Sequence, residues 1–154
     1  MTALVVRKCA VAEIVDNTWF PALHQEYAEE AALAGLPDPT EKLDTYRLLE
    51  SSTVFHVYGA FLGDALAGFV AVLTPVIPHY GVAIAVAESL FVGRAHRKTG
   101  AGLWLIRAAE RHAREAGSPA ILFSAPSGGR LERVLPHLGY RETNKVFMRE
   151  VRHG

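Results

Sequence analysis

The sequence predicts an α/β (α+β) layer structure built as a single domain over residues 1–154. Half of these residues are apolar, which is enough for one domain to bury a core without disulfides or metal. Segments with the two-residue period of strands alternate with segments that have the 3.6-residue period of helices. No internal repeat, linker or low-complexity tract divides the chain. We therefore expect one sheet with helices packed against it.

The first third of the chain predicts one strand followed by two helices. The strand covers residues 4–9, LVVRKC, and a helical pattern covers 11–35, with Pro21 beginning or kinking a turn inside it. The helix-breaking segment LPDP separates this helix from a second predicted helix over 41–51, which Thr40 can cap.

The middle of the chain predicts three strands. Residues 53–62 and 65–77 are rich in β-branched and aromatic side chains, and the Gly-Asp pair between them suits a tight hairpin turn. Residues 82–92 form the third strand, in which alternation predicts one shared face. That face would carry Val82, Ile84, Val86, Glu88, Leu90 and Val92. Glu88 is the one charged residue of this face, so we expect it among large apolar neighbours.

The last third predicts a long helix and three shorter elements. The helix covers residues 101–116 and ends at Gly117. A strand over 120–125, a short broken helix within 128–140 and a final strand over 144–151 follow. The apolar stripe of the long helix consists of Leu105, Ile106, Ala109, Ala113 and Ala116.

The charges are unevenly distributed, although the formal net charge is zero. Residues 10–50 hold nine acidic and two basic residues, a net charge of −7, and residues 93–154 hold twelve basic and five acidic residues, a net charge of +7. Either both regions are solvated helix faces, or an anionic ligand binds the basic one and a cationic ligand approaches the acidic one. The zero total gives no reason to expect nucleic acid or a membrane as partner.

Cysteine content and hydropathy favour a cytoplasmic location. Cys9 is the only cysteine, which excludes a disulfide framework and a thiolate metal cluster. No N-terminal signal-peptide pattern is present, and no apolar run approaches the roughly 20 residues that span a bilayer. The seven histidines have no metal-binding spacing, so we expect no metal.

A glycine-rich stretch, VGRAHRKTGAG, connects the third strand to the long helix. One interpretation is a turn whose glycines merely permit an unusual backbone. The nucleotide-hydrolase phosphate loop fails because no glycine directly precedes the Lys-Thr pair, and the dinucleotide fingerprint fails because Leu105 stands in place of its third glycine. The remaining interpretation is the pattern R-x-x-G-x-G, formed by Arg97, Gly100 and Gly102.

With its flanking elements, this stretch resembles the acetyl-CoA-binding motif of the GNAT N-acetyltransferase superfamily. The resemblance rests on ESLFV at the strand end, on RKTGAG and on the long amphipathic helix, and ERVLPHLGY resembles the next motif of the family. It implies a mixed, mostly antiparallel central sheet flanked by helices, in the order β-α-α-β-β-β-α-β-α-β. It also implies acetyl-CoA as the cofactor, and the fold allows a homodimer.

The resemblance assigns the cofactor to the strand end and the loop. Successive backbone N–H groups at a helix N-terminus can bind a diphosphate, and glycines let it approach closely. The residues assigned to acetyl-CoA are the backbone groups of Leu90, Phe91 and Val92 and the loop residues Arg97, Lys98, Thr99, Gly100, Ala101 and Gly102.

Glu88 is the predicted catalytic base. Apolar neighbours would disfavour its charged form and make it a better base, and some enzymes of the family use an acidic residue in this part of the strand. The alternative is a structural carboxylate paired with an arginine or exposed at the strand end. Leu135 stands where the family often has a tyrosine that protonates the departing thiolate, so the general acid stays unassigned.

By resemblance, the two N-terminal helices form the walls of the acceptor pocket. Carboxylates near aromatic faces suit a protonated amine, although each of these side chains could equally be core or exposed helix face. The residues of these helices assigned to the acceptor are Trp19, Tyr27 and Glu30. His79 and Tyr80, in the turn that enters the Glu88 strand, are added to them.

The sequence therefore predicts an acetyl-CoA-dependent N-acetyltransferase. Its acceptor would be the primary amine of a small molecule, or a lysine or N-terminal amine of a peptide, attacking the thioester directly. One alternative is a non-catalytic acyl-CoA-binding or regulatory module, suggested by Leu135. Another is a toxin-like acetyltransferase that acts on a macromolecular amine, against which the acidic character of the acceptor helices argues.

Overall fold

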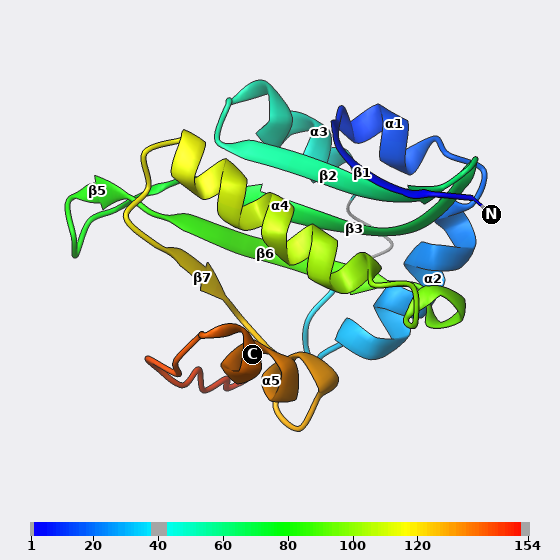
Figure 1. The fold of residues 1–154 in the computed structure, drawn as a ribbon. Coiled ribbons are helices and arrows are strands. Elements are labelled where there is room, and N and C mark those ends of the chain that lie inside the picture. The colour runs from blue at the N-terminus through cyan, green and yellow to red at the C-terminus, as the bar shows by residue number, and fades with distance from the viewer. Residues whose placement is uncertain (1, 38–42, 152–154) are drawn as a thin grey trace.

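The computed structural model describes residues 2–37 and 43–151. A five-stranded sheet forms its centre in the order β1-β2-β3-β6-β7, and a two-stranded β4-β5 sheet extends from one end (Figure 1). The strands are β1 (Leu4–Cys9), β2 (Phe55–Leu62), β3 (Ala65–Leu73), β4 (Val76–Ile77), β5 (Val82–Ala83), β6 (Ala85–Val92) and β7 (Ile121–Phe123). Neighbouring strands of the large sheet are antiparallel except β6 and β7, which are parallel. The predicted mixed, mostly antiparallel sheet is confirmed.

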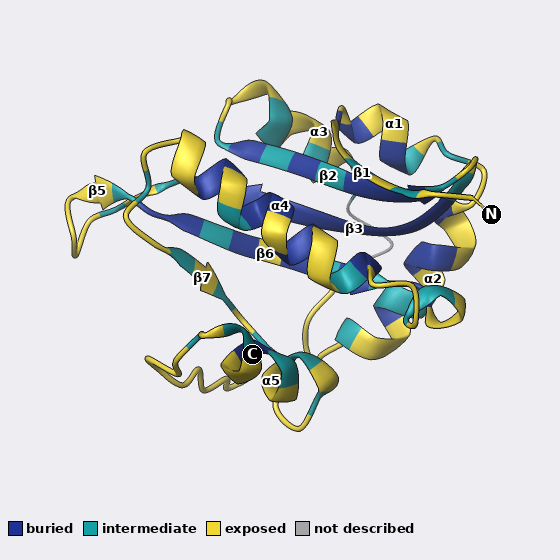
Figure 2. Ribbon diagram, in the orientation of Figure 1, coloured by how far each residue is buried: buried dark blue, intermediate teal, exposed yellow. Residues whose placement is uncertain are grey.

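Helices cover both faces of this sheet. They are α1 (Val11–Val15), α2 (Phe20–Ala31), α3 (Leu43–Ser51), α4 (Ala101–Glu115) and α5 (Arg130–Val134), with 3₁₀ turns at Arg94–His96 and Leu135–Leu138. The core beneath α4 includes Val72 and Leu105, and the core beneath α1, α2 and α3 includes Ile14 and Phe69. Burial is therefore concentrated in the strands between the two layers (Figure 2). Among the described residues, no helix is long and apolar enough to cross a lipid bilayer.

The helical pattern over residues 11–35 folds as two helices instead of one. Between them, the Trp19 N–H donates to Asn17 Oδ1 at 2.9 Å. Pro21 lies in the first turn of α2, where its missing N–H costs no helical hydrogen bond. The interruption predicted at this proline is confirmed. The second predicted helix is observed as α3, and its predicted cap, Thr40, lies outside the described residues.

The hairpin between β2 and β3 is confirmed, with Gly63 at a φ of 61° in its turn. Further along β3, Gly68 lies directly against the end of β6. A Cβ atom at Gly68 would lie 2.5 Å from Phe91 O and 3.1 Å from Val92 Cα. No side chain fits in this space, so Gly68 permits the close approach of the two backbones.

We expect Gly68→Ala to lower the free energy of unfolding by about 1–3 kcal/mol, the usual cost of overpacking. The added methyl group must displace the backbone of β6. Gly102→Ala is the matched control, because a Cβ atom there would lie 3.7 Å from Val92 Cγ2, an ordinary contact distance, and alanine is the better helix former. Urea denaturation of the protein without ligand measures both variants. Equal losses would contradict the steric explanation.

A β-bulge in β6 changes which residues share a face. Ala71 pairs with Ser89 and Val72 pairs with Ala87, so Glu88 is the extra residue of the bulge. The residues of β6 that pack on the α4 side are Ala85, Ala87, Leu90 and Val92. The common face predicted from simple alternation is therefore wrong, because the alternation reverses at the bulge. Glu88 is exposed and does not lie among buried apolar side chains.

The long helix is confirmed as α4, and Gly117, with a φ of 75°, follows its end. Most of the predicted stripe is buried, namely Leu105, Ile106, Ala109 and Ala113. Ala116 is exposed, because it is the C-cap residue and lies beyond the last turn that packs on the sheet.

His112 of α4 and His56 of β2 lie together on the α4 side of the sheet. Their ring centroids are 4.3 Å apart, and His112 Nδ1 shares a hydrogen bond of 2.8 Å with the Tyr58 hydroxyl. Burial lowers the pKa of His112, and the nearby His56 and Lys8 lower it further, while Glu115 raises it. Burial also lowers the pKa of His56, and Lys8 adds to this effect.

We expect this pair to make folding stability fall in acid. An unfolded histidine has a pKa of about 6.5. The folded-state pKa values are lower than this, so near and below a pH of about 6.5 the unfolded chain binds more protons than the folded chain. The contribution of the pair to the free energy of unfolding is therefore fully present above the unfolded pKa and is lost as pH falls through the folded pKa values. His112→Asn should flatten this dependence, whereas His79→Asn, at an exposed position, should not. Thermal unfolding from about pH 8 to about pH 5 measures the difference, and an unchanged slope in His112→Asn would contradict the assignment.

The C-terminal part of the chain only partly follows the prediction. The strand within 120–125 is confirmed as β7, and the broken helix within 128–140 as α5 and the 3₁₀ turn after it. The final strand predicted over 144–151 is not formed. Val146 and Phe147 are 84% and 90% exposed. The prediction fails because a strand needs a neighbour for its backbone hydrogen bonds, and none of the described strands pairs with this segment.

Candidate active site

The parallel strands β6 and β7 separate after a short paired segment. Their pairing ends at Ala87 and Phe123, whereas β3 pairs with the other side of β6 as far as Val92. The edge of residues 88–92 that faces β7 therefore has no strand partner among the described residues (Figure 1). The three strand residues predicted to bind the cofactor lie in this stretch, where free backbone groups can bind a ligand.

The glycine loop forms a tight entry into α4. Gly100, the N-cap residue, has a φ of 85° and a ψ of 2°, a left-handed conformation that favours glycine. The Thr99 hydroxyl donates to His96 O at 2.6 Å and accepts the Ala101 N–H at 3.3 Å. The Thr99 side chain therefore holds the turn together.

The N-terminus of α4 has the properties of an anion site. The N–H groups of Gly102 and Leu103, in the first turn, have no acceptor within the helix, and the positive end of the helix dipole lies there. A Cβ atom at Gly100 would meet Trp104 Cδ1 at 3.8 Å and no other atom within 4 Å, so this side of the loop is open. Lys98 is exposed on the same loop. These features fit a diphosphate group.

Two arginines of the loop contact helix α2. Arg97 Nη2 lies 2.8 Å from both carboxylate oxygens of Glu30, and Arg97 Nε donates to Val92 O at 3.1 Å. Arg94 donates to Glu30 at 3.1 Å and to Glu29 at 3.0 Å. The sequence assigned Arg97 to the cofactor and Glu30 to the acceptor, but the structure pairs them with each other. Their charges fix the loop against α2.

Tyr140 provides an unpaired buried hydroxyl near the point where β6 and β7 separate. Its ring contacts Phe123, the last paired residue of β7, with a centroid distance of 5.4 Å. Within the described structure, Tyr140 Oη is buried and has no hydrogen-bond partner. Burial raises the pKa of Tyr140 to about 12, and Glu110 adds to this effect. A buried hydroxyl without a partner fits a ligand group that enters between the strands.

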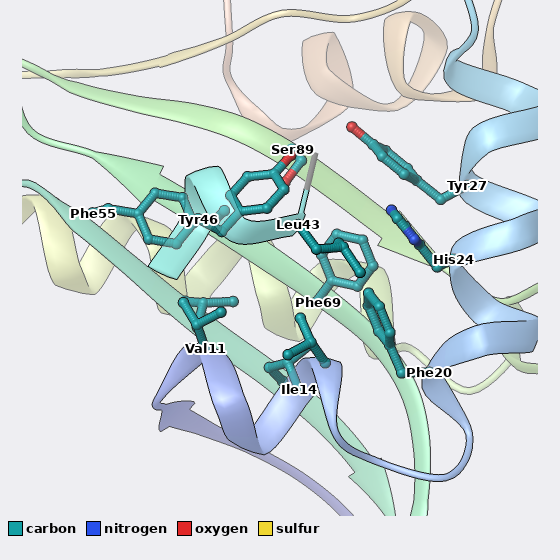
Figure 3. A pocket seen from close by; sticks show the side chains of 13 residues that line it. Val11, Ile14, Phe20, His24, Tyr27, Leu43, Tyr46, Phe55, Phe69 and Ser89 are labelled. Atoms are coloured by element: carbon teal, nitrogen blue, oxygen red, sulfur yellow. The ribbon is translucent and has the colours of Figure 1, made fainter. Parts of the chain in front are cut away.

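A cavity of about 40 Å³ lies between the sheet and helices α1, α2 and α3 (Figure 3). Its lining consists of Val11, Ile14, Val15, Phe20, His24, Tyr27, Leu43, Tyr46, Phe55, Val57, Phe69, Ala71 and Ser89. The Tyr46 hydroxyl donates to Glu88 Oε1 at 3.3 Å. Figure 3 shows the hydroxyls of Tyr27 and Tyr46 on the same side of the cavity as Ser89. The bulge thus places the Glu88 carboxylate beside an apolar cavity.

The negative charge of Glu88 acts on both tyrosines. Burial raises the pKa of Tyr27 to about 12, and the Glu88 carboxylate adds to this effect. Burial also raises the pKa of Tyr46 far above its usual range, with further contributions from Glu88 and Tyr27. Both phenols therefore stay protonated near neutral pH and can donate hydrogen bonds.

The structure brings one of the five predicted acceptor residues to this cavity, namely Tyr27. Glu30 is paired with arginine, and Trp19, which is 51% exposed, precedes α2. His79 and Tyr80 contact each other, with ring centroids 4.7 Å apart, in the loop between β4 and β5. Figure 1 shows this hairpin and α2 at opposite ends of the sheet. The hairpin follows β3 in sequence, but it projects away from the helices.

Tyr46, Ser89 and Tyr140 were not selected as site residues from the sequence. Tyr46 reaches Glu88 because α3 packs on β2, where the Tyr46 ring lies 5.4 Å from that of Phe55. No local pattern could have revealed this contact between distant residues. Tyr140 did carry a signal, since it closes the LGY motif.

Several solved structures share this fold. The ribosomal-protein-alanine N-acetyltransferase from Brucella melitensis biovar Abortus 2308 has a TM-score of 0.73 at 18% identity, over 98% of this chain and 99% of that chain. A predicted acetyltransferase with acetyl-CoA from Clostridium acetobutylicum has a TM-score of 0.75 at 13% identity, over 95% of each chain. An aminoglycoside acetyltransferase from an uncultured soil metagenomic sample, in complex with sisomicin, has a TM-score of 0.73 at 16% identity, over 97% of each chain.

Sequence comparison identifies the family directly. A comparison with curated protein sequences gave no significant match. The model of the acetyltransferase (GNAT) family, however, matches residues 19–140, which is most of the chain and includes the loop, α4 and the cavity-lining helices α2 and α3. This protein therefore belongs to the acetyltransferase (GNAT) family, whose N-acetyltransferases use acetyl-CoA, as the sequence motif predicted.

Proposed function

We propose that the protein transfers the acetyl group of acetyl-CoA to a primary amine, and that Glu88 removes the proton from the attacking nitrogen. The observation that carries this proposal is the position of Glu88. The β-bulge places its carboxylate at the start of the unpaired edge of β6, beside the cavity lined by Tyr46 and Ser89. An acceptor bound beside this carboxylate would therefore present its amine between Glu88 and the strand edge.

The residues that would hold the cofactor are those of the strand edge and the loop. The N–H groups of Gly102 and Leu103 and the Lys98 ammonium suit the diphosphate. The free backbone groups of residues 88–92 suit the amide groups of the pantetheine arm. Bound acetyl-CoA would supply an activated acetyl group, whose carbon–sulfur bond breaks as the amine nitrogen bonds to the carbonyl carbon.

Two protons must move during this reaction. The amine must be neutral to attack, and the Glu88 carboxylate can accept its proton directly or through a water molecule. Leu135 is buried and cannot donate a proton. Tyr140 is our candidate for the donor to the departing sulfur, because its hydroxyl is protonated, buried and unpaired next to the end of β7.

An acetyl-transfer assay tests this proposal. The protein is incubated with acetyl-CoA and single amines: alkylamines, phenethylamine, spermidine, sisomicin and peptides with a free N-terminal alanine. We expect thiol release that depends on the amine, together with an acetylated product in the mass spectrum. Binding of acetyl-CoA without transfer to any amine would contradict the proposed activity and support the non-catalytic binding module.

A further inference from the structure

The cavity beside Glu88 has almost entirely apolar walls. Aromatic rings and aliphatic chains form most of its surface, with contributions from Phe20, Phe55 and Phe69. Ser89 is the lining residue next to Glu88 in sequence, and Tyr46 connects the lining to the carboxylate through its hydrogen bond. A ligand in this space would lose water without gaining many hydrogen bonds, which favours apolar groups and disfavours hydroxyls and ammonium groups.

The acidic side chains of α2 are engaged elsewhere. Glu26 accepts the backbone N–H of Arg94 at 2.8 Å. Glu29 and Glu30 pair with the guanidinium groups of Arg94 and Arg97 at 2.8–3.1 Å. The strongly acidic composition of this region therefore does not produce an acidic groove on α2.

Two further acids near the cavity are also engaged. Glu50 Oε2 accepts the Val11 N–H at 2.6 Å, and Asp16 pairs with Arg47 at 3.2 Å. In the part of the chain that the structure describes, Glu88 is the carboxylate that hydrogen-bonds to a cavity-lining side chain while staying exposed. One carboxylate can neutralise one ammonium group, so a polyamine would leave its other charges without partners here.

We propose that the acceptor is a small monoamine with a short aliphatic substituent that enters the cavity of about 40 Å³ while its nitrogen reaches Glu88. This inference rests on the proposed acetyl transfer and names its substrate class. The cationic amine first pairs with Glu88 and lies near the ring faces of Tyr27 and Tyr46, which attract a positive charge. Each CH₂ group buried in the cavity should then strengthen binding by about fourfold.

Competition among amines tests the substrate class. We expect kcat/KM to rise from methylamine to ethylamine and propylamine, and to fall for isoamylamine and phenethylamine, whose substituents are too large for a cavity of about 40 Å³. Spermidine and sisomicin should be poorer by a factor of about 100 or more, because their extra ammonium groups would remain unpaired. If either polycation were the better acceptor, the monoamine class would be wrong although the acetyl transfer would stand.

A pair of substitutions at Ala71 tests the cavity itself. Ala71 is 2% exposed and lines the cavity from β3. Ala71→Leu should fill the space and raise KM for propylamine at least tenfold, while KM for acetyl-CoA is unchanged. Ala71→Gly enlarges the space and should favour bulkier apolar amines. Retention of the thermal shift with acetyl-CoA shows that each variant is folded, and equal amine profiles in all three proteins would overturn the proposal.

Direct binding separates this inference from the proposed activity. Calorimetry with propylamine and coenzyme A, in the wild type and in Ala71→Ser, requires no turnover. Saturable binding of the amine to the wild type and to Ala71→Ser, together with loss of binding in Ala71→Leu, would support an apolar amine site. This result would hold even if no acetyl transfer were detected. Absence of binding in the wild type would overturn the site regardless of the outcome of the transfer assay.

Discussion

Gly100→Glu is expected to abolish acetyl-CoA binding while leaving the protein folded. A ligand present at one hundred times its dissociation constant stabilises a protein by about 2.7 kcal/mol. The wild type should show this gain in thermal unfolding with acetyl-CoA, and also with a desulfo analogue, which keeps the diphosphate. The variant should show no gain with either ligand, and its acetyl transfer should be lost.

Two physical effects act together in this variant. Gly100 has a φ of 85°, where a side chain costs about 1–2 kcal/mol. The new carboxylate would stand at the open side of the loop, next to the unpaired N–H groups of α4, where it would repel a diphosphate and compete for the same donors. The first effect lowers stability without ligand, and the second removes the response to ligand.

Gly117→Glu is the matched control, because it introduces the same residue at the same kind of backbone position. Gly117 has a φ of 75° and lies after the other end of α4, and a Cβ atom added there would meet no other atom within 4 Å. This variant should lose similar stability but retain the full response to acetyl-CoA. If both variants responded like the wild type, the loop would be only a turn, and the cofactor site would lie elsewhere.

Glu88→Gln is expected to lower kcat by a factor of about 10² to 10⁴, the usual contribution of a general base. Glutamine has the same shape and can still accept the hydrogen bond from Tyr46, so the bulge and the cavity should be unchanged. KM for acetyl-CoA should also be unchanged, because the substitution changes only the side chain, and the cofactor is proposed to contact the backbone of this strand edge. Steady-state kinetics with the best amine of the panel measures both constants.

Two further variants test whether the loss of kcat in Glu88→Gln is caused by removal of the general base. Tyr46→Phe removes the hydrogen bond to Glu88 but keeps the carboxylate, so kcat should fall by about tenfold or less. Glu142→Gln makes the same chemical change on the exposed C-terminal segment and should behave as the wild type. A kcat in Glu88→Gln within about twofold of the wild type would remove Glu88 from the mechanism, since a general base contributes far more than this.

The pairing of Arg94 and Arg97 with α2 accounts for part of the uneven charge of the sequence. The acidic region and the basic region had two interpretations, either solvated helix faces or separate binding sites for a cation and an anion. Instead, part of each charge is used to join α2 to the glycine loop. The loop still has Lys98 and the N-terminus of α4 for an anion. In the part of the chain that the structure describes, Glu88 remains as an exposed carboxylate beside the cavity, where a cation could bind.

The sequence alone determined the secondary-structure elements that depend only on interactions between residues close together in the chain. Strand alternation and helical periodicity depend on neighbouring residues, so β1, the β2–β3 hairpin and α4 follow the pattern closely. The glycine loop was also visible in sequence, because a left-handed residue at Gly100 and a helix start beside it are properties of a few consecutive residues. Together they predicted the family and its cofactor.

The tertiary structure decided everything that depends on which segments meet. The bulge at Glu88 arises from the register of β6 on β3, and it turns a predicted buried carboxylate outward. The contact of Tyr46 with Glu88 joins residues from separate elements. The segment 144–151 alternates like a strand but has no partner among the described strands. Periodicity reports which face of an element is apolar, whereas its neighbours in space are fixed by packing of the whole chain.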